Sequence, residues 1–219
     1  SLHDALPIFG HAMHSYYSDK NQEFSYAQYP IFLAEIASTV NEMLLNEYQI
    51  EHAKNDQEKL LYITSFLDKF RATVFRQTMF AEFEMIAHDK YQNGEALTSK
   101  ELGDIYYDLN KLYYGDNVVS DDLIRYEWSR IPHFYTSFYV YKYATGLCSA
   151  IAIAIDLISG KNNMREKYLE FLKKGSSNYP LEILKECGID MTTSEPIEKS
   201  MEFFKKRLNE AKDIIEKVK

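Results

Sequence analysis

Cysteine is scarce in this chain of 219 residues, which contains only Cys148 and Cys187. The two lie in dissimilar contexts, without a C-x-x-C pair or a ligand-like spacing. This pattern argues against a disulfide framework and against a zinc site built on cysteine. We therefore expect both thiols to be reduced and packed inside the protein.

A basic stripe and a membrane-spanning run are also lacking. The chain has 25 Lys and Arg against 33 Asp and Glu, a net charge of −8, and the two signs are interspersed. Binding to nucleic acid therefore has no electrostatic support. The start does not resemble a signal peptide, and the longest apolar run, 147–158, is too short and interrupted to cross a bilayer. We expect a cytoplasmic protein without a membrane partner, and a buried helix over 147–158.

Strand-type alternation is absent, and apolar residues recur at helical spacing, so the fold class is predicted to be all-α. The length alone fits one large domain, and the only flexible-looking patch, 175–177, is too short for a linker. Capping signals, glycines and prolines divide the chain into segments. The predicted helices span 56–91, 98–112, 132–157, 180–187 and 196 onward, with a further helix capped at 120–122.

The residues around His11 suggest half of a zinc-peptidase motif. Such helices carry H-E-x-x-H, in which two histidines four apart face one metal and the glutamate acts as general base. If His11 is the second histidine, Pro7 and Ile8 stand where the first histidine and the glutamate belong, and neither can perform that role. A third ligand comes from a later helix. Glu35 is the candidate, because a lone carboxylate among apolar neighbours is costly unless it is paired or bound to a metal.

Two further residues near this motif have less direct interpretations. His14 lies three residues after His11 and is rotated away from the expected metal, which favours a role in packing or behind a ligand. Glu42 lies two turns after Glu35 on the same face and is a candidate to hydrogen-bond a ligand histidine. We thus predict His11 and Glu35 as zinc ligands, with His14 and Glu42 around them.

Several segments resemble oligoendopeptidase F, in the thimet-oligopeptidase-like family of zinc metallopeptidases. Residues 10–18 read GHAMHSYYS and residues 29–42 read YPIFLAEIASTVNE, and both resemble the family's zinc motif and its following helix. The resemblance extends over about 10–204 and includes 75–83, 131–135, 139–146 and 179–182. It implies the multi-helix C-terminal part of a channel-forming, zincin-type metallopeptidase that cleaves short oligopeptides, with zinc-bound water as nucleophile.

A third group of candidates is His133 with the tyrosines that follow it. Phenol and imidazole groups can donate to a peptide carbonyl oxygen as negative charge grows there, and the resemblance implies such a use. Tyr139 and Tyr143 are one helical turn apart, whereas Tyr141 points elsewhere. We predict His133, Tyr139 and Tyr143 as catalytic donors. The alternative is plain core, because 18 tyrosines are spread over the chain.

Residues 1–8, SLHDALPI, match the translation of a common sequencing adapter. We expect 1–8 to be a non-native leader and 9–219 to be the C-terminal part of a peptidase catalytic domain. The partner would then be the missing N-terminal region of the same polypeptide, and the chain without it would be inactive. The alternative is a genuine Pro7 and Ile8 in a catalytically inactive helical protein that binds peptides or serves as a scaffold.

Overall fold

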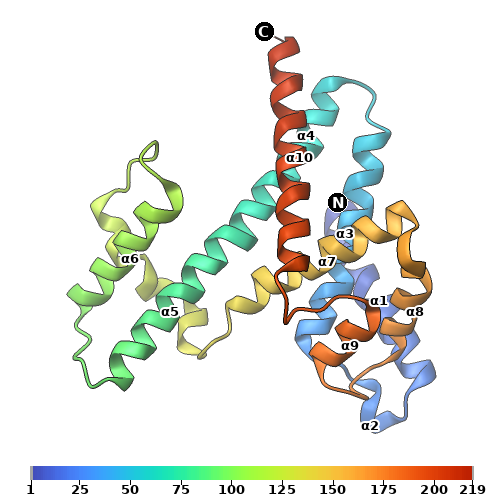
Figure 1. The fold of residues 1–219 in the computed structure, drawn as a ribbon, viewed down its shortest axis with the longest axis horizontal. Coiled ribbons are helices and arrows are strands. Elements are labelled where there is room, and N and C mark those ends of the chain that lie inside the picture. The colour runs from blue at the N-terminus through green and yellow to red at the C-terminus, as the bar shows by residue number, and fades with distance from the viewer. Residues whose placement is uncertain (1, 219) are drawn as a thin grey trace. The chain divides into compact units, whose positions relative to one another are not determined.

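The computed structural model describes the backbone of residues 2–218 and the side chains of 8–161 and 163–217. The described residues form helices and no strand, which confirms the all-α prediction (Figure 1). The chain divides into two compact units: one contains the chain up to Phe70 and from Thr145 onward, and the other contains Arg71–Ala144. The expected boundary between residues 8 and 9 lies inside the first helix, and the side chains of 1–7 lie outside the described residues.

The first unit has a core to which four of its helices contribute. Apolar side chains of two long helices, α3 and α7, pack with those of two shorter ones, α8 and α9, in one core that includes Ile36, Ile153, Phe171 and Leu184. The helices of this unit are α1 (Leu2–Asn21), α2 (Phe24–Ala27), α3 (Ile31–Glu51), α4 (Asp56–Phe70), α7 (Tyr141–Ser159, from Thr145), α8 (Met164–Lys173), α9 (Pro180–Cys187) and α10 (Glu195–Val218), with a 3-10 turn at Lys161–Asn163. The predicted helices over 180–187 and from 196 onward are confirmed.

Helix α7 contains the apolar run 147–158. It is long and apolar enough to cross a membrane by length and composition, and 61% of it is buried inside the protein. The prediction of a buried helix is therefore confirmed, whereas the prediction that the segment is too short to cross a bilayer is wrong for the whole helix, which begins at Tyr141. Both cysteines are free and buried, and burial raises the pKa of the Cys148 thiol to about 11 and that of Cys187 to about 12. These thiols are packed and protonated, as expected.

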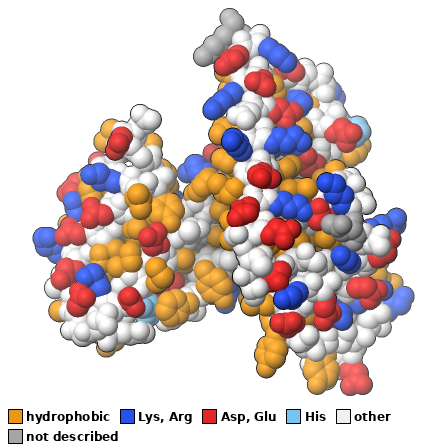
Figure 2. All heavy atoms as spheres, in the orientation of Figure 1, with side chains coloured by type: hydrophobic (Ala, Val, Ile, Leu, Met, Phe, Trp, Pro, Cys, Tyr) orange, Lys and Arg blue, Asp and Glu red, His pale blue; other side chains and the backbone are white. Residues whose placement is uncertain are grey.

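The surface carries charges of both signs. Figure 2 shows Lys and Arg side chains interspersed with Asp and Glu on the face in view. The patch 175–177, predicted to look flexible, is instead fixed by the backbone: the Ser176 N–H donates to the Tyr26 carbonyl oxygen at 2.8 Å. Gly175 has a positive φ of 52°, and a Cβ there would lie 2.1 Å from the same Tyr26 oxygen. Glycine is therefore required at that position.

A close helix crossing positions the residues around His11. A Cβ on Gly10 of α1 would lie 2.5 Å from the Ser38 Cα and 2.9 Å from the Ala37 carbonyl oxygen, both on α3. The two backbones approach this closely only because Gly10 has no side chain. The crossing therefore holds the turn of α1 that carries His11 against the middle of α3.

We expect Gly10→Ala to lower the free energy of unfolding by about 1 to 3 kcal/mol, because the added methyl forces the two helices apart. Urea unfolding followed by circular dichroism measures this loss. Gly146→Ala is the matched control, since a Cβ at that helical position meets Phe32 only at 4.0 Å. Alanine is the better helix former, so the control should be neutral or stabilising. Equal losses in the two variants would contradict the close crossing.

The second unit begins with a π-helical segment, η1 (Arg71–Phe75), that follows α4 directly and leads into α5 (Arg76–Gln92). The predicted helix over 56–91 is thus one helical run with a π segment in its middle. The unit continues with α6 (Ser99–Tyr114) and two 3-10 segments, η2 (Asp122–Arg130) and η3 (Pro132–Tyr135). The capping box is confirmed: the Thr98 hydroxyl accepts from the Glu101 N–H, and the Glu101 carboxylate accepts from the Thr98 N–H.

The predicted helix over 132–157 is wrong in its first part. After η3 the backbone leaves helical geometry until α7 begins at Tyr141. Phe138 has a φ of 55°, a left-handed conformation through which a right-handed helix cannot continue. Its N–H donates at 2.5 Å to the buried carboxylate of Glu84 on α5. A tertiary hydrogen bond therefore replaces the helical one at this position.

Candidate functional site

The two predicted zinc ligands lie in the first unit, on helices that touch. His11 is half-buried on α1, and Glu35 lies on α3 one turn before Ser38. Because Gly10 contacts Ser38, the turn that carries His11 is adjacent to the turn that carries Glu35. The Ser38 hydroxyl also donates to the Glu35 carbonyl oxygen at 3.4 Å.

The expected burial of Glu35 is wrong, because its side chain is exposed. Helix α3 buries Leu33, Ile36, Ala37 and Val40, and Glu35 lies off that face. An exposed carboxylate keeps its hydration without a metal, so burial gives no argument for zinc at Glu35. What remains in favour of a metal is the chemistry of the donor, since carboxylate oxygen is a suitable zinc ligand.

Glu42 is engaged by a lysine of the neighbouring helix. It forms an ion pair with Lys69 of α4, and both side chains are partly buried. Burial lowers the pKa of Lys69, and the nearby Glu35 carboxylate opposes that shift. This pairing ties α3 to α4. That Glu42 supports a ligand histidine stays a prediction, because the side chain at position 7 lies outside the described residues.

The residues present do not complete a zinc site. Within the part of the chain that the structure describes, no three His, Cys, Asp or Glu side chains are grouped so as to hold a metal ion. His11 and Glu35 supply an imidazole nitrogen and a carboxylate oxygen, whereas catalytic zinc has three protein ligands. Ile8 presents hydrocarbon that is 67% exposed, and the Pro7 side chain lies outside the described residues. The chain as it stands therefore offers two of the three ligands.

His14 packs inside the protein behind His11. Its ring stacks on Tyr29 with centroids 3.6 Å apart and planes 4° apart, and its other neighbour is Phe171. The Tyr29 hydroxyl hydrogen-bonds Ser15 at 2.8 Å and donates to the His11 carbonyl oxygen at 3.3 Å. His14 thus has the packing role that its position predicted, and Tyr29 fixes this part of α1 to the segment that precedes α3.

We expect His14 to make the folded state less stable in acid. Burial lowers its pKa from 6.5 to about 4, and neither ring nitrogen has a partner among the described residues. The unfolded chain therefore binds a proton that the folded chain excludes, and stability falls as the pH drops below 6.5. Between about pH 7 and about pH 5 the loss from this group is about 2 kcal/mol.

Urea unfolding at the two pH values measures this loss. The control is His14→Phe, which keeps an aromatic ring against Tyr29 but cannot titrate. Between about pH 7 and about pH 5, the free energy of unfolding of this variant should fall by about 2 kcal/mol less than that of the unsubstituted chain. An identical pH dependence in the two proteins would show that His14 is protonated in the folded state.

The three predicted donors meet in the second unit. His133 lies in η3, Tyr139 lies in the segment before α7, and Tyr143 lies in the first turn of α7. The Tyr143 hydroxyl is 3.1 Å from His133 Nε2. The His133 ring is 5.5 Å from that of Tyr139, and the two tyrosine rings are 5.8 Å apart. Tyr139 precedes the helix, so the non-helical segment, rather than a shared helical face, brings it to Tyr143.

Glu84 holds the segment that presents these donors, and the sequence reasoning missed it. Its carboxylate accepts from the Phe138 N–H, one residue before Tyr139. The Phe138 ring also packs on His88 at 4.5 Å, and the Lys142 ammonium lies 4.8 Å over the Tyr139 ring. The signal in the sequence was an acidic residue on the apolar face of α5, next to Phe80 and Phe83.

Arg76 has a structural role. Its guanidinium pairs with Glu127 at 2.7 Å and lies 5.0 Å over the Phe80 ring. The same Glu127 carboxylate accepts from the Tyr106 hydroxyl at 2.6 Å, which together with burial raises the pKa of Tyr106. This part-buried network joins α5, α6 and η2.

Comparison with known proteins gives consistent matches over nearly the whole chain. Residues 8–203 match the family model described as peptidase family M3. The chain is 49% identical over 211 residues to oligopeptidase PepF of Bacillus subtilis (strain 168), an alignment that covers 96% of this chain and 32% of that protein. It is 46% identical over 208 residues to the plasmid oligoendopeptidase F of Lactococcus lactis subsp. cremoris, covering 95% and 35%.

The fold also matches a solved structure. The crystal structure of oligoendopeptidase-F from Enterococcus faecium resembles this chain with a TM-score of 0.89 and 43% identity, covering 98% of this chain and 39% of that one. The chain therefore spans about a third of the length of the curated relatives that it matches.

Proposed function

This chain belongs to peptidase family M3, and from that premise we propose that it is part of a zinc-dependent metalloendopeptidase that hydrolyses short oligopeptides. The observation that carries the proposal is the meeting of His133, Tyr139 and Tyr143, three side chains that can donate to one carbonyl oxygen. Relatives that are 46 to 49% identical bear the names oligopeptidase and oligoendopeptidase. A cytoplasmic location is part of the same proposal.

The role of the three donors follows from where charge develops. When a nucleophile attacks a peptide carbonyl, negative charge grows on the oxygen, and donors already in place lower the barrier by about 2.7 to 4 kcal/mol each. The contact of Tyr143 with His133 orients the imidazole. The hydrogen bond between Phe138 and Glu84 holds Tyr139 beside it. Tyr139 and the Tyr143–His133 pair are thus held together in the second unit, and the bond between Tyr143 and His133 would open when both groups donate to the oxyanion.

The zinc ligands of this chain would be His11 and Glu35. Zinc, when bound, supplies an activated water. Two ligands do not make a catalytic site, and Pro7 and Ile8 cannot supply a third ligand or a general base. We therefore propose that the chain with these two residues is inactive. Completion would come from a histidine and a glutamate at positions 7 and 8 and from the N-terminal region of the same polypeptide.

Zinc binding tests the assignment of the two ligands without requiring turnover. We expect the purified chain to retain less than one zinc per molecule after dialysis, because two ligands hold zinc more weakly than three. His11→Ala and Glu35→Gln should each lower the retained zinc further, as measured by atomic absorption. His52→Ala is the control, since the ring of that histidine hydrogen-bonds the Tyr48 carbonyl oxygen at the end of α3, away from His11 and Glu35 in the sequence. Zinc loss in the control alone would refute the assignment.

One observation favours the second candidate function, a helical scaffold that binds peptides without cutting them. The described residues contain no complete metal-binding group, and Pro7 and Ile8 stand in the motif. The two functions are separated by the peptidase activity of a chain in which these residues are His and Glu. Cleavage of a fluorogenic peptide after that change supports the enzyme, and peptide binding without cleavage supports the scaffold.

A further inference from the structure

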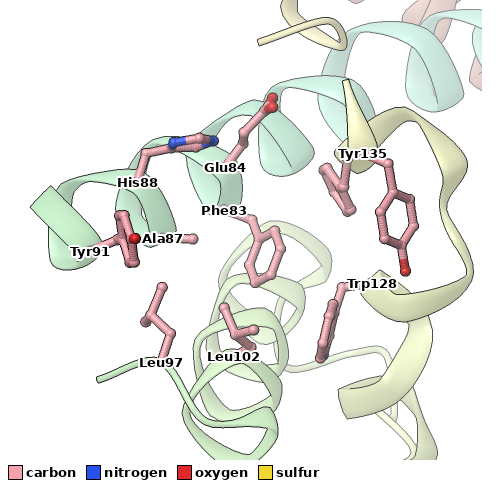
Figure 3. A pocket seen from close by; sticks show the side chains of 10 residues that line it. Phe83, Glu84, Ala87, His88, Tyr91, Leu97, Leu102, Trp128 and Tyr135 are labelled. Carbon is pink, nitrogen blue, oxygen red and sulfur yellow. The ribbon is translucent and has the colours of Figure 1, made fainter. Parts of the chain in front are cut away.

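A cavity of about 260 Å³ lies in the second unit, the unit that also contains the three donors. Phe134 and Tyr135, which line it, follow His133 in the same 3-10 segment. In Figure 3, Phe83 of α5 points toward Leu102, and Trp128 and Tyr135 lie on another side of the cavity. The lining is mainly apolar and aromatic, which is the usual character of a site for an organic ligand.

The size of the cavity suits one large side chain. A dry cavity of roughly 150 Å³ lined by apolar residues binds benzene, so the larger cavity here has room for an aromatic ring and its attached methylene. Phe83 forms the floor and is almost fully buried, whereas Tyr91 and Tyr135 are exposed at the rim. A side chain can therefore enter from solvent and leave the rest of its peptide outside.

Trp128 adds its indole ring to the wall of the cavity. Its neighbours in that wall include Phe83, whose ring lies 6.3 Å from the indole, and Phe83 lies 5.2 Å from Phe134. Aromatic rings pack favourably edge to face or offset against one another. A peptide residue with an aromatic or large aliphatic side chain thus matches this lining.

We propose that this cavity is a subsite that binds one aromatic or large aliphatic side chain of a peptide substrate, an inference that rests on the proposed peptidase function. The subsite would select peptides with such a residue near the bond whose carbonyl meets His133. Glu84 and His88 line the same cavity, and Glu84 is already engaged by the Phe138 N–H. The Glu84 carboxylate therefore belongs to the wall of the subsite and also holds the segment that carries Tyr139.

Trp128 is the only tryptophan in the chain, so its fluorescence reports on this cavity alone. The experiment titrates the full chain with two capped tripeptides, Ac-Ala-Phe-Ala-NH2 and Ac-Ala-Ala-Ala-NH2, which differ only in the central side chain. We expect a saturable change in Trp128 emission with the Phe peptide. We expect at least about tenfold weaker binding of the Ala peptide. It lacks the phenyl ring, and an apolar pocket distinguishes ligands that differ by even one methylene group.

Three variants test whether the response comes from the cavity. Ala87→Phe fills it and should abolish the saturable response, and Leu97→Glu, in the loop that lines it, should weaken binding without altering a helix. Met85→Phe is the matched control on the same helix: its side chain is 59% exposed and it does not line the cavity, so binding should be unchanged. Circular dichroism confirms that each variant is folded.

The outcomes separate this inference from the proposed function. Equal responses to both peptides, or none, would overturn the subsite. Trp128 emission could instead change with protein concentration but not with added peptide. That result would show that a second copy of the chain occupies the cavity, and it would also overturn the peptide subsite. Binding needs neither zinc nor cleavage. A chain that binds the Phe peptide but never cleaves any peptide, even with His and Glu at positions 7 and 8, would leave the subsite standing and remove the peptidase.

Discussion

Replacing Pro7 by His and Ile8 by Glu is expected to give this chain chelator-sensitive oligopeptidase activity. The host for this experiment is a chimera in which the chain replaces the matching third of its Bacillus subtilis relative, to which it is 49% identical. Positions 7, 8 and 11 all lie in α1. Two histidines four residues apart then share one helical face, and the new glutamate stands beside them as general base.

The expected gain is large because all ligands and the base appear together. Without the two substitutions no turnover should be detected, and with them kcat should reach the common range of about 1 to 1,000 per second. Hydrolysis of a fluorogenic peptide, with and without a chelator, measures the change. Folded proteins should be cut little, as the family resemblance implies.

Single substitutions are the controls for this gain. Pro7→His alone should restore zinc without turnover, because the general base is still absent. Glu35→Gln in the doubly substituted chimera should lose both zinc and activity. Turnover in the chimera that keeps Pro7 and Ile8 would contradict the prediction. Tight zinc binding without cleavage after both substitutions would favour the scaffold.

The helical segments were predictable from the sequence where their signals are local. Thr98 and Glu101 form a capping box from residues three apart, and Tyr179–Pro180 and Gly188 delimit a helix by their backbone preferences. The break before α7 was not predictable in this way. It depends on the bond from the Phe138 N–H to Glu84, which lies 54 residues earlier in the chain. Local propensity contains no information about that partner.

The candidate site shows the same division between local and tertiary information. The motif around His11 and the pattern after Tyr29 identified residues on two contacting helices, as the Gly10 crossing shows. The environment of Glu35 was misjudged because apolar neighbours in sequence are not neighbours in space. Leu33 and Ile36 point into the core while Glu35 faces solvent. Tyr139 and Tyr143 do meet, but through a non-helical segment rather than through helical spacing.

Tyr139→Phe and Tyr143→Phe should each lower kcat of the restored enzyme about a hundredfold to a thousandfold, the usual effect of removing one oxyanion donor. KM and zinc content should change little, because a donor aimed at the developing charge acts in the transition state rather than on the bound substrate or the metal. Tyr141→Phe is the matched control. It lies between the two, is exposed, and should leave kcat unchanged.

The contact between Tyr143 and His133 makes a further distinction possible. The Tyr143 hydroxyl lies 3.1 Å from His133 Nε2, so the two residues should act as a unit. The loss of transition-state stabilisation in the double variant Tyr143→Phe, His133→Ala should therefore be smaller than the sum of the losses in the two single variants. Additive losses would mean that each donates to the carbonyl independently. A rise in KM with unchanged kcat would instead show that the tyrosines bind the substrate in its ground state, and the assignment of oxyanion donors would be wrong.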